Sequence, residues 1–149
     1  MNNKTNDIVC AYISGACTLQ TKCGGWGIVL TREGKRLEKA EGESNTTNNR
    51  MALTAAIKAL QIISKNNSEK PIVVATSSQY VVDGMNTHLK EWKQKQWRKS
   101  DKKPVLNEDL WKQLDELNQS MSISWVKESC GHIEIGKADA LAKAAKPTI

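Results

Sequence analysis

The chain has 149 residues, a net charge of +6 and a pI near 9.2. No apolar run approaches the length that spans a membrane, and residues 1–7 are too polar to form a signal peptide. The excess of lysine and arginine favours a polyanionic partner or an anionic surface. We expect one cytoplasmic domain over residues 1–149, with a core over about 8–146 and a polar tail over 1–7.

The first apolar run, residues 8–17, predicts a buried strand. We expect it to end in a turn of small residues at 14–16. The end of a buried central strand is where an α/β sheet usually carries its chemistry, and the residue at that position is Ser14.

The middle of the chain alternates strand and helix patterns. Residues 24–31 and 36–43 predict two strands joined by a hairpin turn at 32–35, and the second is polar enough for a sheet edge. A helix is predicted over 50–64 after a polar cluster, and a buried strand over 71–76, parallel to the first. Residues 77–79 cap a further helix over 80–88.

The last third begins with a basic stretch, residues 89–99, that contains interleaved tryptophans. Asn107 is predicted to cap a helix that runs to about residue 118, with Trp111 and Leu114 facing inward. A strand over 122–126, a loop over 128–135 and an alanine-rich helix over 136–146 complete the chain. Adjacent antiparallel strands followed by parallel crossovers predict an α/β fold with a mixed sheet and helices packed on it.

The four cysteines, Cys10, Cys17, Cys23 and Cys130, have no CxxC spacing. This argues against a zinc site, although the sequence around Cys130 and His132 is a weak fragment of one. We expect reduced thiols, as in a cytosolic protein.

Several strings, in this order, resemble type 1 ribonuclease H of the bacterial type, the family that cuts the RNA strand of an RNA–DNA hybrid. They are Gly24-Gly25-x-Gly27, Thr46-Thr47-Asn48-Asn49-Arg50-Met51, Ser78-Gln79-Tyr80-Val81, Asp101-Lys102-Lys103-Pro104-Val105, Asp109-Leu110-Trp111 and Trp125-Val126-Lys127. The resemblance implies a ribonuclease H-like fold: a five-stranded mixed sheet, its first three strands antiparallel, with helices on both faces.

The resemblance also implies a catalytic centre of four carboxylates that hold two Mg²⁺ or Mn²⁺ ions. At three of these positions the chain has Ser14, Ala52 and Ser77, and only the fourth carboxylate remains, as Asp139. Ser129 stands where the family has a histidine in a mobile loop. We therefore expect no metal cofactor, with Asp139 at most as a ligand. Glu134 and Asp83 are the nearest candidates for a rebuilt site, and neither replaces the central position at Ser14.

The family's nucleic-acid contacts are better retained. Polar residues that would touch the minor groove of a hybrid and a phosphate match Thr47, Asn48, Asn49 and Gln79; Asn48 and Asn49 could instead cap a helix, and the two roles can hold together. The family's basic handle, residues 92–99, is matched by Trp92, Lys93, Lys95, Trp97, Arg98 and Lys99, in which the cations would meet phosphates and the two tryptophans would pack the segment together. Two departures, His88 for tryptophan and Gln20 for asparagine, are expected to lower affinity.

These residues predict a ribonuclease H-like protein that binds RNA–DNA hybrid or double-stranded RNA without cleaving it.

 We expect a monomer. Two alternatives remain open. One is a domain for protein interaction or a structural role on the same fold, and the other is a residually active ribonuclease H whose metal site has been rebuilt.

Overall fold

The computed structural model describes residues 8–66, 70–99 and 101–148, so the predicted tail over 1–7 lies outside the described residues. Within them, five strands form one sheet: β1 (Val9–Cys17), β2 (Gly24–Arg32), β3 (Lys35–Glu43), β4 (Ile72–Thr76) and β5 (Ile123–Lys127). The strand order is β3-β2-β1-β4-β5. The first three strands pair antiparallel, whereas β4 is parallel to β1 and β5 is parallel to β4. The predicted mixed sheet is confirmed.

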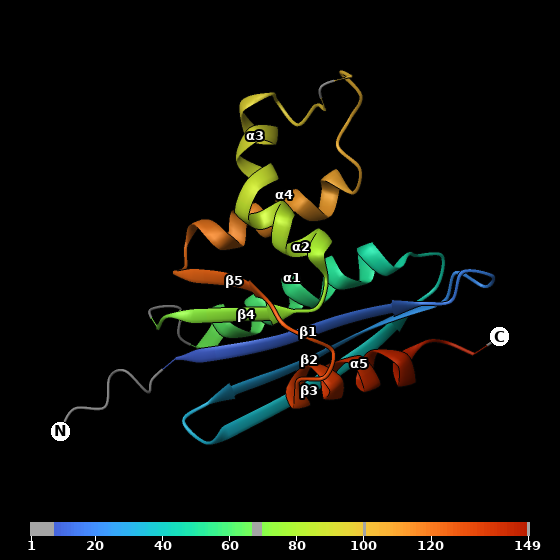
Figure 1. Cartoon of the computed structure of the whole chain (residues 1–149), viewed down its shortest axis with the longest axis vertical. Helices are drawn as coiled ribbons and strands as arrows, with labels where there is room; N and C mark the ends of the chain where they lie inside the picture. Colours follow the sequence, from blue (N-terminus) through green and yellow to red (C-terminus); the bar gives the residue numbers. More distant parts are fainter. Residues whose placement is uncertain (1–7, 67–69, 100, 149) are drawn as a thin grey trace.

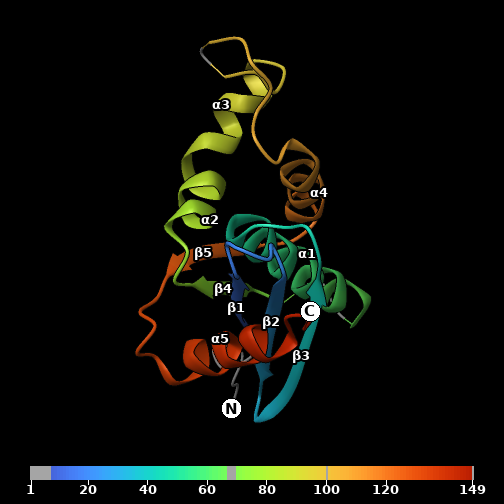
Figure 2. The ribbon, with the colours of Figure 1, turned by 90° about the vertical axis from the view of Figure 1, so that its right-hand side faces the viewer.

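The helical elements are α1 (Asn48–Asn66), α2 (Gln79–Asp83), the π-helix η2 (Gly84–His88), α3 (Leu89–Gln94), α4 (Glu108–Gln119) and α5 (Ile133–Ala145). Helices α1 and α5 lie on opposite faces of the sheet, and α4 packs beside α1 (Figures 1 and 2). The core between α1 and the sheet is closed by fully buried side chains such as Ile13, Met51, Leu53 and Trp111. This arrangement confirms the expectation of helices on both faces.

The α2, η2 and α3 segments follow one another without a break and project from the sheet, at the top of the view in Figure 1. The sequence pattern predicted a helix that ends at residue 88, whereas the structure continues it to Gln94. The reason is a helical stripe of apolar residues, Val82, Met85, Leu89 and Trp92, at spacings of three and four. Helical structure therefore extends into the handle.

Other details of the elements also differ from the sequence prediction. The small residues at 14–16 form no turn, because Ser14 to Cys17 continue the antiparallel ladder opposite Gly24 to Gly27. Helix α5 begins at Ile133 rather than 136, since His132 Nδ1 accepts the N–H of Glu134 at 3.1 Å and caps the helix. Asn107 precedes α4 but forms no side-chain cap; its backbone is left-handed, with φ of 61°.

The cysteines are free thiols, as the sequence predicts. No helix in the part of the chain that the structure describes is long and apolar enough to cross a membrane.

Candidate functional site

A cavity of about 390 Å³ opens where β1 and β4 meet the helices α1 and α5. The four positions at which the family resemblance implies carboxylates all line it, although they come from distant parts of the chain. With two lysines that the sequence prediction did not include, the lining positions of interest are Ser14, Ala52, Ser77, Asp139, Lys143 and Lys146. The structure thus brings the predicted catalytic positions together, apart from Ser129.

Two glycines set the positions of the helices beside this cavity. A Cβ atom at Gly15 would overlap the backbone of Met51 and Ala52, so α1 lies directly against β1. On the other face, a Cβ atom at Gly27 would overlap the carbonyl oxygen of Ala138, so α5 lies equally close to β2. These close approaches hold Ala52 and Asp139 next to Ser14, which is 6% exposed within β1.

Among the residues that the structure describes, Asp139 is the single carboxylate that lines the cavity, and both of its oxygens have partners. Ser14 Oγ donates a hydrogen bond to Asp139 Oδ1 at 3.2 Å, and Lys143 Nζ lies 3.0 Å from Asp139 Oδ2. The hydrogen bond to Asp139 raises the pKa of Lys143 above its usual value, so this lysine is cationic at neutral pH. Lys146 Nζ donates to Thr18 Oγ1 at 2.9 Å. The cavity lining therefore holds two ammonium groups and one carboxylate.

The first turn of α1 borders the cavity with Asn48 and Asn49. The cap of this helix comes from Thr47, whose Oγ1 accepts the N–H of Arg50 at 3.1 Å. The capping role that the sequence suggested for Asn48 and Asn49 thus belongs to Thr47. Both asparagines are exposed, so their side chains face solvent at the edge of the cavity.

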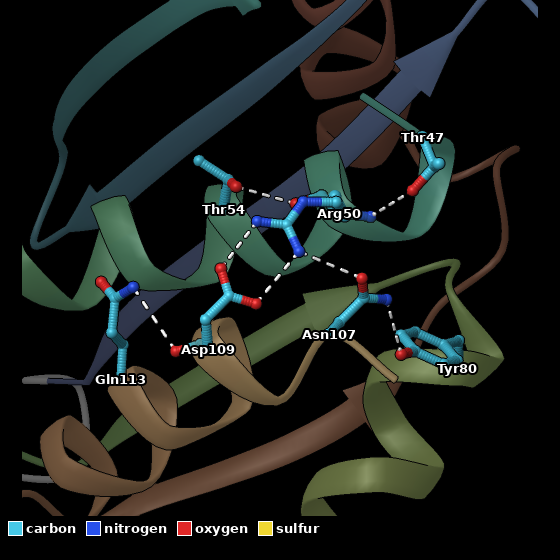
Figure 3. A network of polar contacts seen from close by, with 7 residues as sticks. All are labelled: Thr47, Arg50, Thr54, Tyr80, Asn107, Asp109 and Gln113. Carbon is cyan, nitrogen blue, oxygen red and sulfur yellow. Dashed lines mark hydrogen bonds and ion pairs between the residues drawn. The ribbon is translucent and has the colours of Figure 1, made fainter. Parts of the chain in front are cut away.

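A polar network beneath the handle joins α1 to α2 and α4 (Figure 3). Arg50 binds Asp109 through two nitrogens, at 3.1 and 2.8 Å, and also donates to Asn107 Oδ1 at 3.1 Å. Because Asn107 Oδ1 accepts from Arg50, it does not cap α4, and Asn107 Nδ2 in turn donates to the hydroxyl oxygen of Tyr80 at 3.0 Å. The network fixes the first turn of α1 relative to the base of the handle.

The tryptophans of the handle pack inward. Trp92 lies with its ring centroid 5.1 Å from that of Trp111 and 6.4 Å from that of Trp97, and both Trp92 and Trp97 pack against the buried core. Lys112 Nζ sits 5.5 Å from the centroid of the Trp97 ring, within range of a cation–π contact. The expected packing role of these two tryptophans is confirmed, and a contact with nucleic acid stays a prediction.

The cations of the handle differ in their surroundings. Lys93 pairs with Asp115 at 3.1 Å, and Lys99 lies 4.0 Å from Asp101. Lys95 and Arg98 are exposed and form no ion pair with any residue that the structure describes. Gln79 is exposed at the start of α2, and its Nε2 donates to Asp83 Oδ1 at 2.7 Å. Lys95 and Arg98 are therefore the handle cations best placed to meet a phosphate.

Comparison with known proteins decides the family. Residues 6–146 match the family model of RNase H. The chain belongs to the RNase H family. A ribonuclease H of Thiobacillus denitrificans is 46% identical over 140 residues, which cover 93% of each chain. A ribonuclease HI of Neisseria meningitidis serogroup B is 40% identical over 139 residues, which cover 92% of this chain and 94% of the relative.

Solved RNase H structures share the fold. The crystal structure of LC9-RNase H1, described as a type 1 RNase H with the type 2 active-site motif, superposes with a TM-score of 0.83 at 28% identity and covers 94% of this chain and 72% of that one. LC11-RNase H1, solved in complex with an RNA/DNA hybrid, superposes with a TM-score of 0.72 at 21% identity, over 92% of this chain and 95% of that one. The second likeness concerns the fold alone.

The donor set of this RNase H cavity suits Mg²⁺ poorly. Mg²⁺ is held mainly by carboxylate oxygens, and the lining offers one carboxylate that is already paired with an ammonium group. No cluster of three or more His, Cys, Asp or Glu side chains that could hold a metal lies among residues 8–66, 70–99 and 101–148. Glu134 is bound by Arg36 at 2.6 Å, which lowers the pKa of the Glu134 carboxyl, and neither Glu134 nor Asp83 lines the cavity.

Ser129 lies outside the cavity lining, on the exposed loop before α5. Its Oγ accepts the N–H of Gly131 at 2.9 Å, so the side chain stabilises the loop locally. The lysines of α5 are what sequence reasoning missed. Lys143 follows Asp139 by four residues, a spacing that places the two side chains on one face of a helix, and this was a readable signal. Lys146, at the end of α5, gave no comparable signal.

Proposed function

We propose that this RNase H family member binds RNA–DNA hybrid or double-stranded RNA without cleaving it. The observation that carries the proposal is the cavity at the four catalytic positions, where the remaining carboxylate, Asp139, is bound by Ser14 and Lys143. The handle also supports the proposal, because Lys95 and Arg98 are exposed cations. These features support a surface that binds a duplex beside a cavity whose residues suit metal ions poorly.

Two surfaces would share the duplex. Exposed polar side chains of Thr47, Asn48 and Asn49 at the start of α1 suit the wide minor groove and the 2′-hydroxyl groups of an A-like duplex. The handle cations suit the phosphates of the other strand, where each contact releases bound counterions and makes affinity depend on salt. The network around Arg50 supports this division, since it ties the first turn of α1 to α2 and α4, and Trp92 of the handle packs against Trp111 of α4.

Metal-assisted hydrolysis needs one ion to activate the attacking water and a second to stabilise the leaving oxygen. Removing one essential catalytic group typically lowers a rate by a factor of about 10² to 10⁶. Here three metal-binding carboxylates are absent together, at Ser14, Ala52 and Ser77. We therefore expect cleavage at background level, and no bound Mg²⁺ or Mn²⁺.

A second candidate function is residual ribonuclease H activity. It is favoured by relatives named Ribonuclease H that are 40 to 46% identical over nine-tenths of the chain. It would require a rebuilt metal site around Asp139. A third, a protein-interaction domain, would need no contact with nucleic acid.

The experiment is a titration of end-labelled RNA–DNA hybrid at low salt, in EDTA, Mg²⁺ or Mn²⁺, with the same samples run on a denaturing gel. Lys95→Glu combined with Arg98→Glu reverses the handle charges. Lys35→Glu combined with Lys39→Glu is the matched control, because it makes the same charge change on the exposed edge strand β3, away from the handle (Figure 1).

We expect the protein to bind the hybrid independently of metal and to leave the RNA intact. The loss of affinity should be at least tenfold greater in the handle variant than in the β3 variant. Cleavage that disappears in Asp139→Asn would establish the residual ribonuclease instead. Absence of hybrid and double-stranded RNA binding at low salt would favour the protein-interaction domain.

A further inference from the structure

The lining of the cavity at the catalytic positions carries a net positive charge. It carries the ammonium groups of Lys143 and Lys146 and the carboxylate of Asp139, which is two positive charges and one negative charge. We infer that this cavity binds one phosphate of the nucleic-acid backbone directly, through its lysines, where active family members would hold metal ions. The inference deepens the proposed function and rests on it for the identity of the ligand.

The contacts within the cavity leave the positive charge available. Asp139 is occupied at both oxygens, by Ser14 Oγ at 3.2 Å and by Lys143 Nζ at 3.0 Å. The Lys143 side chain is nevertheless 64% exposed, so the pair is open to solvent and to a ligand on its outer side. Lys146 donates to the neutral hydroxyl of Thr18 and forms no ion pair within the described residues. An ammonium group has three hydrogens, so both lysines retain donors for a phosphate oxygen.

Neutral donors surround the two lysines. The hydroxyl of Ser78 accepts the N–H of Val81, which leaves its own hydrogen to donate, and Ser77 also lines the cavity. On the opposite side lies the first turn of α1, a helix of 19 residues, with the side-chain amides of Asn48 and Asn49. The positive end of the helix dipole adds to the field of the lysines. Hydroxyl, amide and ammonium donors around one opening suit a phosphate oxygen and offer little to a cation.

The volume also permits this ligand. At about 390 Å³ the cavity is larger than a phosphate group, so it can receive the phosphate of a phosphodiester. Such binding would need no divalent cation. It would also respond in opposite directions to two changes in charge: loss of the lysines should weaken it, and neutralisation of Asp139 should strengthen it.

The first test uses the intact protein and two probes, inorganic phosphate and dimethyl phosphate, the second being a singly charged mimic of the backbone. Amide resonances of Gly15, Asn49 and Ser77 are followed by NMR at constant ionic strength, with chloride as the reference anion. The variants are Lys143→Met combined with Lys146→Met, Asp139→Asn, and the control Lys65→Met, which removes a lysine from the far end of α1. The Lys95→Glu, Arg98→Glu variant tests independence from the handle.

We expect saturable shifts at these amides with both probes. The shifts should be lost in the double lysine variant and unchanged in Lys65→Met and in the handle variant. In Asp139→Asn the dissociation constant obtained from them should fall at least twofold. Shifts with inorganic phosphate but none with dimethyl phosphate would overturn the assignment of the ligand as a backbone phosphate. Shifts equal to those in chloride, or retained in the double lysine variant, would overturn the site itself.

The second test measures affinity for hybrid as a function of salt. Because each phosphate contact contributes about one unit to the slope of log K against log salt, the double lysine variant should lower that slope by about 1 relative to Lys65→Met. An equal slope in the two variants would contradict the inference even where hybrid binds tightly. Failure of the wild-type protein to bind hybrid would instead contradict the proposed function, and the phosphate titration would then decide the cavity separately.

Discussion

Ser14 Oγ donates its hydrogen bond to Asp139 Oδ1 across 125 positions of the sequence, at a distance of 3.2 Å. A second carboxylate at residue 14 would stand beside Asp139 and repel it unless a cation lay between them. The neutral hydroxyl of Ser14 avoids that repulsion and donates a hydrogen bond to the Asp139 carboxylate. With serine at residue 14, this part of the sheet has no pair of adjacent carboxylates that a metal ion would have to neutralise.

Mg²⁺ should therefore leave the thermal stability of the protein unchanged. A ligand that binds the native state at ten times its dissociation constant would stabilise it by about 1.4 kcal/mol, which is a few degrees in melting temperature. We expect no such shift when 10 mM MgCl₂ replaces NaCl of equal ionic strength in a calorimetric scan. A rise of several degrees would show that the described carboxylates do hold the ion.

Restoring the three acids should reverse this behaviour. In Ser14→Asp, Ala52→Glu, Ser77→Asp, four carboxylates face one cavity, so the melting temperature without metal should fall and Mg²⁺ should raise it. Metal-dependent cutting of the RNA strand should appear. The control adds Asp139→Asn to the triple variant. Stability indifferent to Mg²⁺ in a folded triple variant would mean that these positions do not form a metal site.

The close contact of α5 with β2 can be tested through one glycine in each element. In Gly27→Ala the new methyl group would meet the carbonyl oxygen of Ala138, so we expect a loss of about 1–3 kcal/mol in the free energy of unfolding. Gly136 lies within α5, and the nearest atom to an added Cβ is 3.7 Å away. Gly136→Ala should therefore raise the free energy of unfolding by about 0.5–1 kcal/mol. Urea denaturation measures both, and equal effects would contradict the packing argument.

Much of this fold was predictable because its elements have strong local patterns. The apolar run of β1, the helical spacing in α4 and the serine cap at Ser78 all appear in the structure where the sequence predicts them. The errors come from contacts between distant segments. Ser14 continues a strand because it pairs with Gly27. Asn107 does not cap α4 because its Oδ1 accepts a hydrogen bond from Arg50, 57 positions away.

The candidate site was predictable as a set of positions, because the strings that carry the family resemblance fix Ser14, Ala52, Ser77 and Asp139. Its charge was not. The sequence indicated the loss of three acids, whereas the presence of Lys146 in the same cavity depends on how the end of α5 lies against Gly25 of β2. That placement follows from tertiary packing, which local patterns do not specify.

The ion pair between Arg50 and Asp109 should make part of the stability depend on pH. The hydrogen bond from Arg50 lowers the pKa of Asp109 below its ordinary value. The pair therefore stabilises the fold above the ordinary pKa of aspartate, and this contribution is lost as the pH falls through the lower pKa of the folded state. Because the Asp109 side chain is 60% exposed, solvent screens the pair and its contribution should stay below about 1 kcal/mol.

The variant that tests this is Asp109→Asn, which keeps the shape of the side chain and removes its charge. Its melting temperature should be lower than that of the wild type at pH 7, and the two should converge as the pH falls below the ordinary range of aspartate. Asp101→Asn is the control, because Asp101 lies on the exposed loop after the handle and its ion pair, with Lys99, is a long one of 4.0 Å. A difference at pH 7 that persists unchanged at pH 2 would show that Asp109 acts through packing rather than through its charge.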